Sequence, residues 1–115
     1  MKVAELKDIL ELTHLNGTPD ALNREVTGGY CGDLLSWVMS RASSGQAWIT
    51  IMQNANTAKV AALADVSCVI LAEGVTPDAD LTKRASTDDL PLFLSSKPAY
   101  KLGGMLYECL LNNKK

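Results

Sequence analysis

The sequence has few of the residues on which most catalytic and metal sites depend. It contains a single histidine, His14, and only three cysteines in 115 residues. Cys31, Cys68 and Cys109 show no Cys-x-x-Cys spacing, which argues against a structural zinc site and a disulfide framework. Any catalytic triad would have to use His14, which lies in an alternating segment and is predicted to be an ordinary strand residue. We therefore expect no metal site, no cofactor and no enzymatic activity.

Long apolar runs and an excess of positive charge are also missing. No apolar segment approaches the roughly 18 residues that a membrane span requires. Residues 1–8 alternate charged with apolar side chains, which is unlike a signal peptide. The formal net charge of −2 argues against nucleic-acid binding through bulk positive charge. We expect a cytoplasmic protein that has neither a membrane nor a nucleic acid as its partner.

The composition that remains is that of an ordinary globular protein. Hydrophobic residues make up 47% of the chain and charged residues 21%, which excludes disorder for most of its length. A chain of 115 residues has room for one domain. We predict a single domain over residues 1–115, with a polar tail at residues 112–115 that frays.

The spacing of apolar residues alternates between helical and strand periods, which is typical of an α/β fold. Strands separated by short helices pair in parallel through right-handed crossovers. We therefore predict a single layered domain with a mostly parallel sheet of four or five strands flanked by helices. The predicted helices cover residues 3–10, 34–42, 58–64, 77–86 and 99–110, and the predicted strands cover residues 12–15, 24–26, 47–52, 66–71 and 90–94.

Local residue types mark several of the predicted boundaries. Asp33 is the expected N-cap of the helix over 34–42, and Thr76 is the expected cap of the helix over 77–86. Pro77 would then occupy the first helical position, which proline favours. The segment Asn16–Asp20 is expected to be a turn between two strands.

The segment Asn23–Gly29, with the sequence Asn-Arg-Glu-Val-Thr-Gly-Gly, resembles the motif of the DRTGG domain family. The likeness extends from about Val3 to Leu110 and is carried by Arg24 and by Thr27-Gly28-Gly29, while Asn23 stands where an acid is expected. It implies a compact α/β domain that regulates or assembles other modules, such as HPr kinase/phosphorylase and pyrophosphatases with CBS domains. It also implies a homodimer, an adenine nucleotide as ligand and a partner enzyme.

The loop Thr27–Asp33 is the first candidate ligand site. Gly28, Gly29 and Gly32 would permit positive φ and a close approach of the backbone, and the helix that follows could offer free N–H groups to an anion. The strand predicted before this loop would place it at the carboxyl edge of the sheet, where open α/β sheets bind ligands. The alternative is a purely structural turn, because Asp33 places a carboxylate where a phosphate would lie and no Walker A spacing follows.

A second candidate segment, Gln53–Thr57, follows the strand predicted over 47–52. Asn54 and Asn56 could contact a base edge or a ribose hydroxyl, although asparagines at such positions also cap helices and form turns. Parallel topology brings the ends of neighbouring strands to one edge of the sheet. We therefore expect a ligand in a crevice between Thr27–Asp33 and Gln53–Thr57.

These observations favour a non-catalytic regulatory or adaptor domain that forms homodimers and binds an adenine nucleotide. Trp37, at the border of its helix's buried stripe, is a candidate for the protein contact, with boundary packing as the alternative. Two other functions stay open. One is a small enzyme acting on a phosphorylated metabolite, with Asp33, Thr50 and Asn54 at the strand ends. The other is a structural assembly partner that binds no small ligand.

Overall fold

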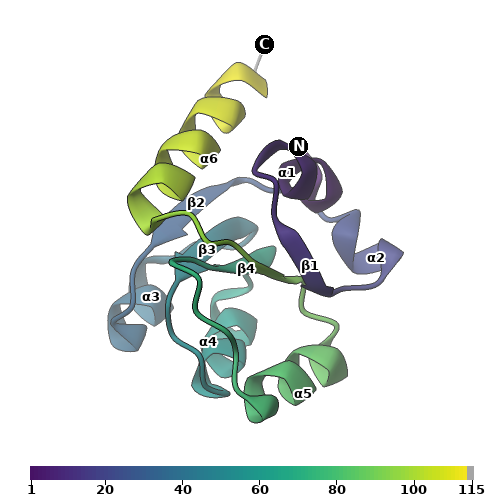
Figure 1. Ribbon diagram of the computed structural model, residues 1–115, viewed down its shortest axis with the longest axis vertical. Coiled ribbons are helices and arrows are strands. Elements are labelled where there is room, and N and C mark those ends of the chain that lie inside the picture. The colour runs from purple at the N-terminus through teal and green to yellow at the C-terminus, as the bar shows by residue number, and fades with distance from the viewer. Residues whose placement is uncertain (114–115) are drawn as a thin grey trace.

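Five strands form the centre of the structure, a computed structural model that describes residues 1–113 (Figure 1). Their order across the sheet is β1-β5-β4-β3-β2. Strands β2 to β5 pair in parallel, and β1 lies antiparallel to β5 at one edge. The prediction of a single α/β domain with a mostly parallel sheet is confirmed. The strands are β1 (Thr13–Asn16), β2 (Gly28–Cys31), β3 (Gln46–Thr50), β4 (Cys68–Leu71) and β5 (Leu92–Leu94).

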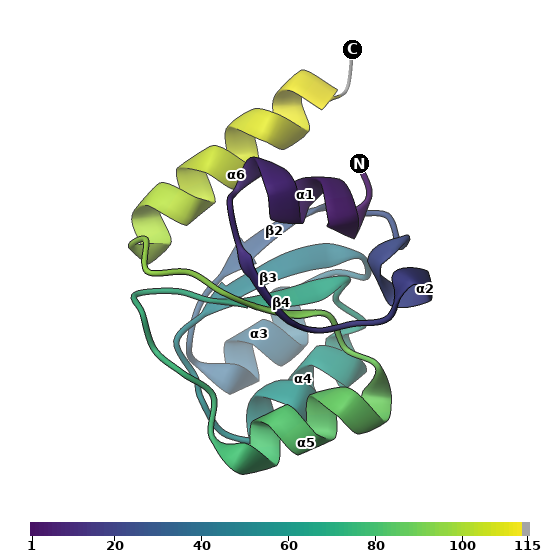
Figure 2. The same ribbon diagram turned by 45° about the vertical axis from the view of Figure 1, so that its right-hand side comes forward.

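Helices cover both faces of this sheet (Figure 2). On one face lie α1 (Val3–Ile9) and α6 (Ala99–Asn113), with the short α2 (Pro19–Leu22) beside α1. On the other face lie α3 (Leu35–Arg41), α4 (Asn56–Ala64) and α5 (Ala79–Asp88). Among residues 1–113, no helix is long and apolar enough to cross a membrane.

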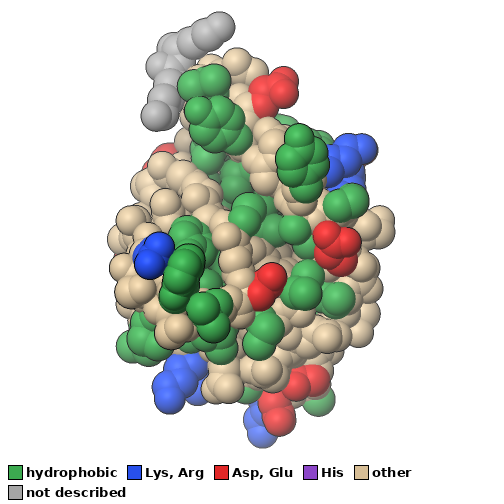
Figure 3. All heavy atoms as spheres, turned by 90° about the vertical axis from the view of Figure 1, so that its left-hand side faces the viewer, with side chains coloured by type: hydrophobic (Ala, Val, Ile, Leu, Met, Phe, Trp, Pro, Cys, Tyr) green, Lys and Arg blue, Asp and Glu red, His purple; other side chains and the backbone are tan. Residues whose placement is uncertain are grey.

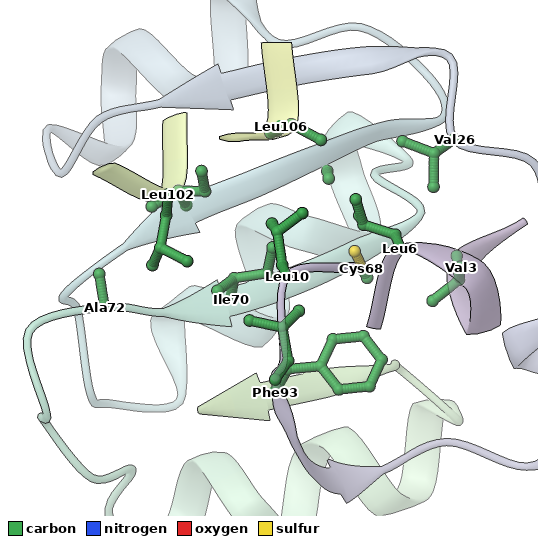
Figure 4. Packing of buried hydrophobic residues seen from close by; sticks show 13 residues of the cluster. Val3, Leu6, Leu10, Val26, Cys68, Ile70, Ala72, Phe93, Leu102 and Leu106 are labelled. Carbon is green, nitrogen blue, oxygen red and sulfur yellow. The ribbon is translucent and has the colours of Figure 1, made fainter. Parts of the chain in front are cut away.

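Each face of the sheet has its own apolar core, because the central strands are buried on both sides. Side chains of α1 and α6, among them Leu6, Leu102 and Leu106, meet Ile70 of β4 and Phe93 of β5 (Figure 4). The opposite core is formed by α3, α4 and α5 against the alternate strand residues, which include Trp48, Val69, Leu71 and Leu92. Strands β3 and β4 are therefore apolar along nearly their whole length, which is why the sequence predicts them well.

The predicted strand over 24–26 is wrong, and the strand of this region is β2 at Gly28–Cys31. Val26 is buried, but its N–H donates to the carbonyl of Met1 in a linking segment. The two consecutive glycines of β2 hide the strand in the sequence, because glycine is unfavourable in strands. The displacement moves Thr27, Gly28 and Gly29 from the carboxyl end of a strand to the amino end of β2.

Several boundaries also differ from the predictions. Part of the turn predicted over Asn16–Asp20 is the start of α2, with Thr18 as its N-cap. Helix α5 is capped by Asp78 and not by Thr76, so Pro77 precedes the helix. The N-cap position of α3 is held by Leu34 and not by Asp33. Of the tail predicted to fray, residues 112–113 belong to α6, while residues 114–115 lie outside the described part of the chain.

Candidate functional site

The residues predicted to line one crevice lie at opposite ends of the sheet. Gly28 pairs with Gln46 at the start of β3, whereas Asn54 follows the end of that strand at Thr50. Five residues of extended chain separate these ends by about 13 Å. The structure therefore brings Gly32 and Asp33 towards the segment of Asn54 and Asn56 at the carboxyl edge, but it does not bring Thr27, Gly28 or Gly29 there.

At the amino edge, Arg24 binds the end of α4. Its Nη1 donates to the carbonyl of Val66 at 3.0 Å, and its Nη2 donates to the carbonyl and the carboxylate of Asp65 at 2.9 and 2.7 Å. The last carbonyls of a helix lack partners within it and carry partial negative charge. The arginine of the motif therefore holds the segment before β2 against the segment before β4.

Thr27 makes a second link at the same edge. Its N–H donates to the carbonyl of Gly45 at 2.9 Å, and its hydroxyl donates to the carbonyl of Ser44 at 2.9 Å. Gly45 has a φ of +84°, and a Cβ there would lie 2.7 Å from the Thr27 methyl group. The motif residues Arg24 and Thr27 thus join the amino ends of β2, β3 and β4, which is a structural role.

Asp65 completes this cluster. Its carboxylate accepts hydrogen bonds from the Ser44 hydroxyl and the Arg24 guanidinium. The Ser44 hydroxyl and then the Arg24 guanidinium lower the pKa of Asp65 below its ordinary value. Both oxygens of Asp65 are therefore used within the protein.

Of the three predicted loop glycines, Gly29 is the one that close packing requires, and none of them forms a left-handed turn. None of Gly28, Gly29 and Gly32 has a positive φ, so that expectation was wrong. A Cβ at Gly29 would lie 2.4 Å from Cδ2 of Leu106, whereas a Cβ at Gly28 would meet nothing closer than 3.5 Å. Gly29 therefore permits α6 to cross β2 closely.

At the carboxyl edge, Asp33 joins the ends of β2 and β3. Its Oδ1 accepts from the Thr50 hydroxyl at 2.7 Å and from the Ile51 N–H at 3.0 Å. The preceding carbonyl of Gly32 accepts from the Trp48 indole N–H at 2.9 Å. Asp33 is thus a link between strand ends, and its exposed carboxylate borders the open side of this edge.

The segment after β3 is held by hydrogen bonds of the capping type. Oδ1 of Asn54 accepts from the Asn56 N–H at 2.9 Å, which closes a turn just before α4, whose N-cap position is held by Ala55. Gln53 links this segment to the turn before α5, because its Nε2 donates to the carbonyl of Thr76 at 2.6 Å. Both asparagines are exposed, and a ligand at this edge would meet the Nδ2 amino group of Asn54.

The amino ends of four helices also lie at this edge, because α3, α4, α5 and α6 each follow a parallel strand. Helix amino ends carry partial positive charge and favour anions. Two of them are already served by carboxylates: Asp78 accepts from the Leu81 N–H at 2.8 Å, and Glu73 accepts from the Ala99 N–H at 2.8 Å. Neither α3 nor α4 has a capping side chain at its start, and the Asn56 N–H at the start of α4 donates to Oδ1 of Asn54.

The same edge is poor in reactive groups. The Thr50 hydroxyl is buried and donates to Asp33. Desolvation and then the negative charge of Asp33 raise the pKa of the Cys31 thiol at this edge, and burial raises that of Cys68, at the opposite end of β4, to about 12, so neither is a thiolate at neutral pH. Within residues 1–113, no three His, Cys, Asp or Glu side chains gather to hold a metal ion.

A groove that the sequence did not predict lies between β2 and α6. It has a volume of about 330 Å³ and is lined by Thr27, Gly28, Gly29, Cys31, Gly103, Leu106, Tyr107, Leu110 and Leu111. The signal in the sequence is the position of Tyr107 and Leu111, two apolar residues of the last helix that lie outside its buried stripe. Three of the predicted ligand residues, Thr27, Gly28 and Gly29, therefore face this groove and not the carboxyl edge.

Comparison with known proteins finds a related fold. No family model and no curated protein matches the sequence. The crystal structure of the CBS and DRTGG domains of the regulatory region of Clostridium perfringens pyrophosphatase, with its activator diadenosine tetraphosphate, matches with a TM-score of 0.70. The identity is 14%, and the match covers 91% of this chain but only 45% of that chain. This chain therefore has a fold related to part of the regulatory region of an enzyme.

Proposed function

We propose that this protein is a non-catalytic regulatory or adaptor domain of the DRTGG type, which pairs with a second copy of itself and responds to an adenine nucleotide. The observation that carries the proposal is the likeness of fold, along 91% of the chain, to the regulatory region of a pyrophosphatase that binds diadenosine tetraphosphate. Arg24 and Thr27-Gly28-Gly29 of the motif support it from the sequence side. A cytoplasmic partner enzyme would receive the signal.

The proposed ligand site is the carboxyl edge, with Gly32, Asp33, Asn54 and Asn56 as its residues. A carboxylate at a strand end is suited to accepting hydrogen bonds from ribose hydroxyls, and Asp33 keeps one carboxylate oxygen beyond the Oδ1 that Thr50 and Ile51 use. The amino end of α4 would attract the phosphate, and the Nδ2 amino group of Asn54 would contact the ligand. Because Asp33 is negatively charged, the nucleoside part of the ligand, and not its phosphates, would lie next to Asp33.

Thermal unfolding with added nucleotides tests the ligand class. We expect AMP, ADP, ATP or diadenosine tetraphosphate to raise the melting temperature by several degrees, because a ligand at about 100 times its dissociation constant adds about 2.7 kcal/mol to the folded state. Inorganic phosphate at the same concentration serves as the control for simple anion binding.

The variant Asn54→Ala tests the position of the site. Each variant is compared with its own unliganded melting temperature, because Asn54→Ala also removes the hydrogen bond that the Asn56 N–H donates to Asn54. We expect this variant to lose most of the nucleotide-induced shift, while Asn113→Ala, at the exposed end of α6, keeps it. No shift with any nucleotide, an equal shift in both variants, or turnover of the nucleotide by pure protein would contradict the proposal.

A further inference from the structure

The two edges of the sheet differ in how they are protected. At the β1 edge the register is irregular between His14 and Asn16. At the other edge, all four residues of β2 pair regularly with β3, and none of Gly28–Cys31 is charged or a proline. Natural proteins usually protect edge strands with charges, prolines or irregular register, because an unprotected edge is a template for another strand.

Exposed apolar side chains flank the β2 edge on both faces of the sheet. On the α6 side, Tyr100 is 93% and Tyr107 72% exposed. On the α3 side, Leu34 is 58% and Trp37 52% exposed. The face of the molecule seen in Figure 3 carries several groups of hydrophobic side chains.

The area of this surface is enough for a stable contact between two proteins. An aromatic side chain contributes about 150–250 Å² when it is covered. Three exposed aromatic residues, with the leucines beside them, offer a large part of the roughly 800 Å² that each partner buries in a stable interface. Isolated apolar residues on a surface are common and need no partner. A set of them on both sides of an unprotected edge strand marks a surface for contact with another protein.

The charges at this edge indicate that the partner is a second copy in antiparallel orientation. Asp33 follows the carboxyl end of β2, whereas Arg41 ends α3, which runs back towards the amino end. The Arg41 guanidinium stacks on Trp37, with its carbon 3.8 Å from the ring centroid. A two-fold axis through the strand pair would place each Asp33 near Arg41 of the other copy, whereas a parallel arrangement would bring like charges together.

We propose that β2 pairs antiparallel with β2 of a second copy around a two-fold axis, which joins the two sheets into one. The axis places the α6 helices of the two copies side by side on one face and the α3 helices on the other, so that Tyr107 and Trp37 become buried. Such a contact is self-complementary, as two-fold interfaces are. The inference rests on the self-association in the proposed function and assigns its surface.

Light scattering and sedimentation of the full chain test this interface. The wild-type protein should have twice the 12.3 kDa mass of one chain at micromolar concentration. Cys31→Lys places a charge on the α6 side of the edge strand β2, beside Gly103, and should weaken the dimer at least tenfold, because burying an unpaired charge is costly. Thr13→Lys places the same charge on the other edge strand, where Thr13 is exposed, and should leave the dimer intact.

Tyr107→Lys is the second variant, because Tyr107 lies on the exposed side of α6 and its replacement does not disturb the core. It should also yield monomers. If the wild-type protein is a dimer and the Cys31→Lys and Tyr107→Lys variants are dimers as well, this interface is wrong, while self-association stands. A wild-type monomer up to millimolar concentration would overturn the interface and self-association together, and nucleotide binding would still be judged by the thermal unfolding of the Asn54→Ala and Asn113→Ala variants.

Discussion

Gly29 shows how one residue positions a helix against the sheet. Its missing side chain leaves room for Leu106, whose Cδ2 atom would lie 2.4 Å from a Cβ at this position. The neighbouring Gly28 faces only ordinary contacts with Gln46, at 3.5 Å or more. Two glycines of one motif therefore have different physical roles, which the sequence alone does not separate.

This difference can be measured with two alanine variants. Gly29→Ala should lower the free energy of unfolding by about 1–3 kcal/mol, because α6 must move to relieve the overlap. Gly28→Ala should change it by less than about 0.5 kcal/mol. Urea denaturation of both variants gives the comparison. Equal effects would show that Gly29 is not the point of close contact with α6.

The pKa of Asp65 gives a prediction about acid stability. The Ser44 hydroxyl and the Arg24 guanidinium hold it below the ordinary value of 3.8. A carboxyl group whose pKa is lower in the folded state adds stability above its unfolded pKa, and this contribution is lost as the pH falls below about 3.8.

The variant Asp65→Asn should therefore be less stable than the wild type at pH 7, and the difference should shrink as the pH falls through the acid range. Ser44→Ala removes one hydrogen bond but keeps the charge, so it should cause a smaller loss in the same direction. Denaturant curves between pH 2 and pH 7 provide the measurement. A pH-independent difference for Asp65→Asn would contradict the assignment.

The roles of the candidate-site residues could be predicted where their hydrogen-bond partners lie nearby in the sequence. A turn or capping role of Asn54 was weighed from the sequence, and the partner of Asn54 in the turn is only two residues away. The role of Asp33 was not predicted, since its partner Thr50 comes from the next strand. Hydrogen bonds between distant segments depend on strand register, which residue types do not specify.

At the scale of elements, the sequence before α5 offers two possible N-cap residues, Thr76 and Asp78. The pattern Thr-Pro-Asp favoured Thr76 as the cap, with Pro77 in the first helical position. In the structure the Asp78 carboxylate accepts from the Leu81 N–H, and α5 begins at Ala79. Proline restrains the residue before it to extended backbone and is compatible with either start.

The capping residue of α5 can be identified by substitution. Asp78→Ala should lower the free energy of unfolding by about 1 kcal/mol, because the Leu81 N–H loses its partner. Thr76→Ala should have almost no effect, since the Thr76 carbonyl that accepts from Gln53 is retained. Thermal denaturation of the two variants decides between them, and a larger loss for Thr76→Ala would contradict the structure.

At the scale of the whole molecule, the layered α/β fold followed from the alternation of buried strands and helices, while the place of one strand did not. Strands β3 and β4 are marked by apolar residues on both faces, but β2 has two glycines and only a partly buried tyrosine. A shift of four residues at the start of that strand moved three of the seven predicted site residues to the opposite edge. Such an error leaves the predicted layers unchanged, because the burial pattern specifies them. It does change the predicted binding site, because the residues of a site must lie at the same edge of the sheet.

The proposed function depends on an adenine nucleotide binding at the carboxyl edge of the sheet. Nuclear magnetic resonance of isotope-labelled protein, titrated with ATP and with diadenosine tetraphosphate, tests it most directly. We predict that the largest changes in amide chemical shift fall on Gly32, Asp33, Asn54 and Asn56. Changes confined to Thr27–Gly29 and the groove beside α6, or no changes with either nucleotide, would contradict the claim.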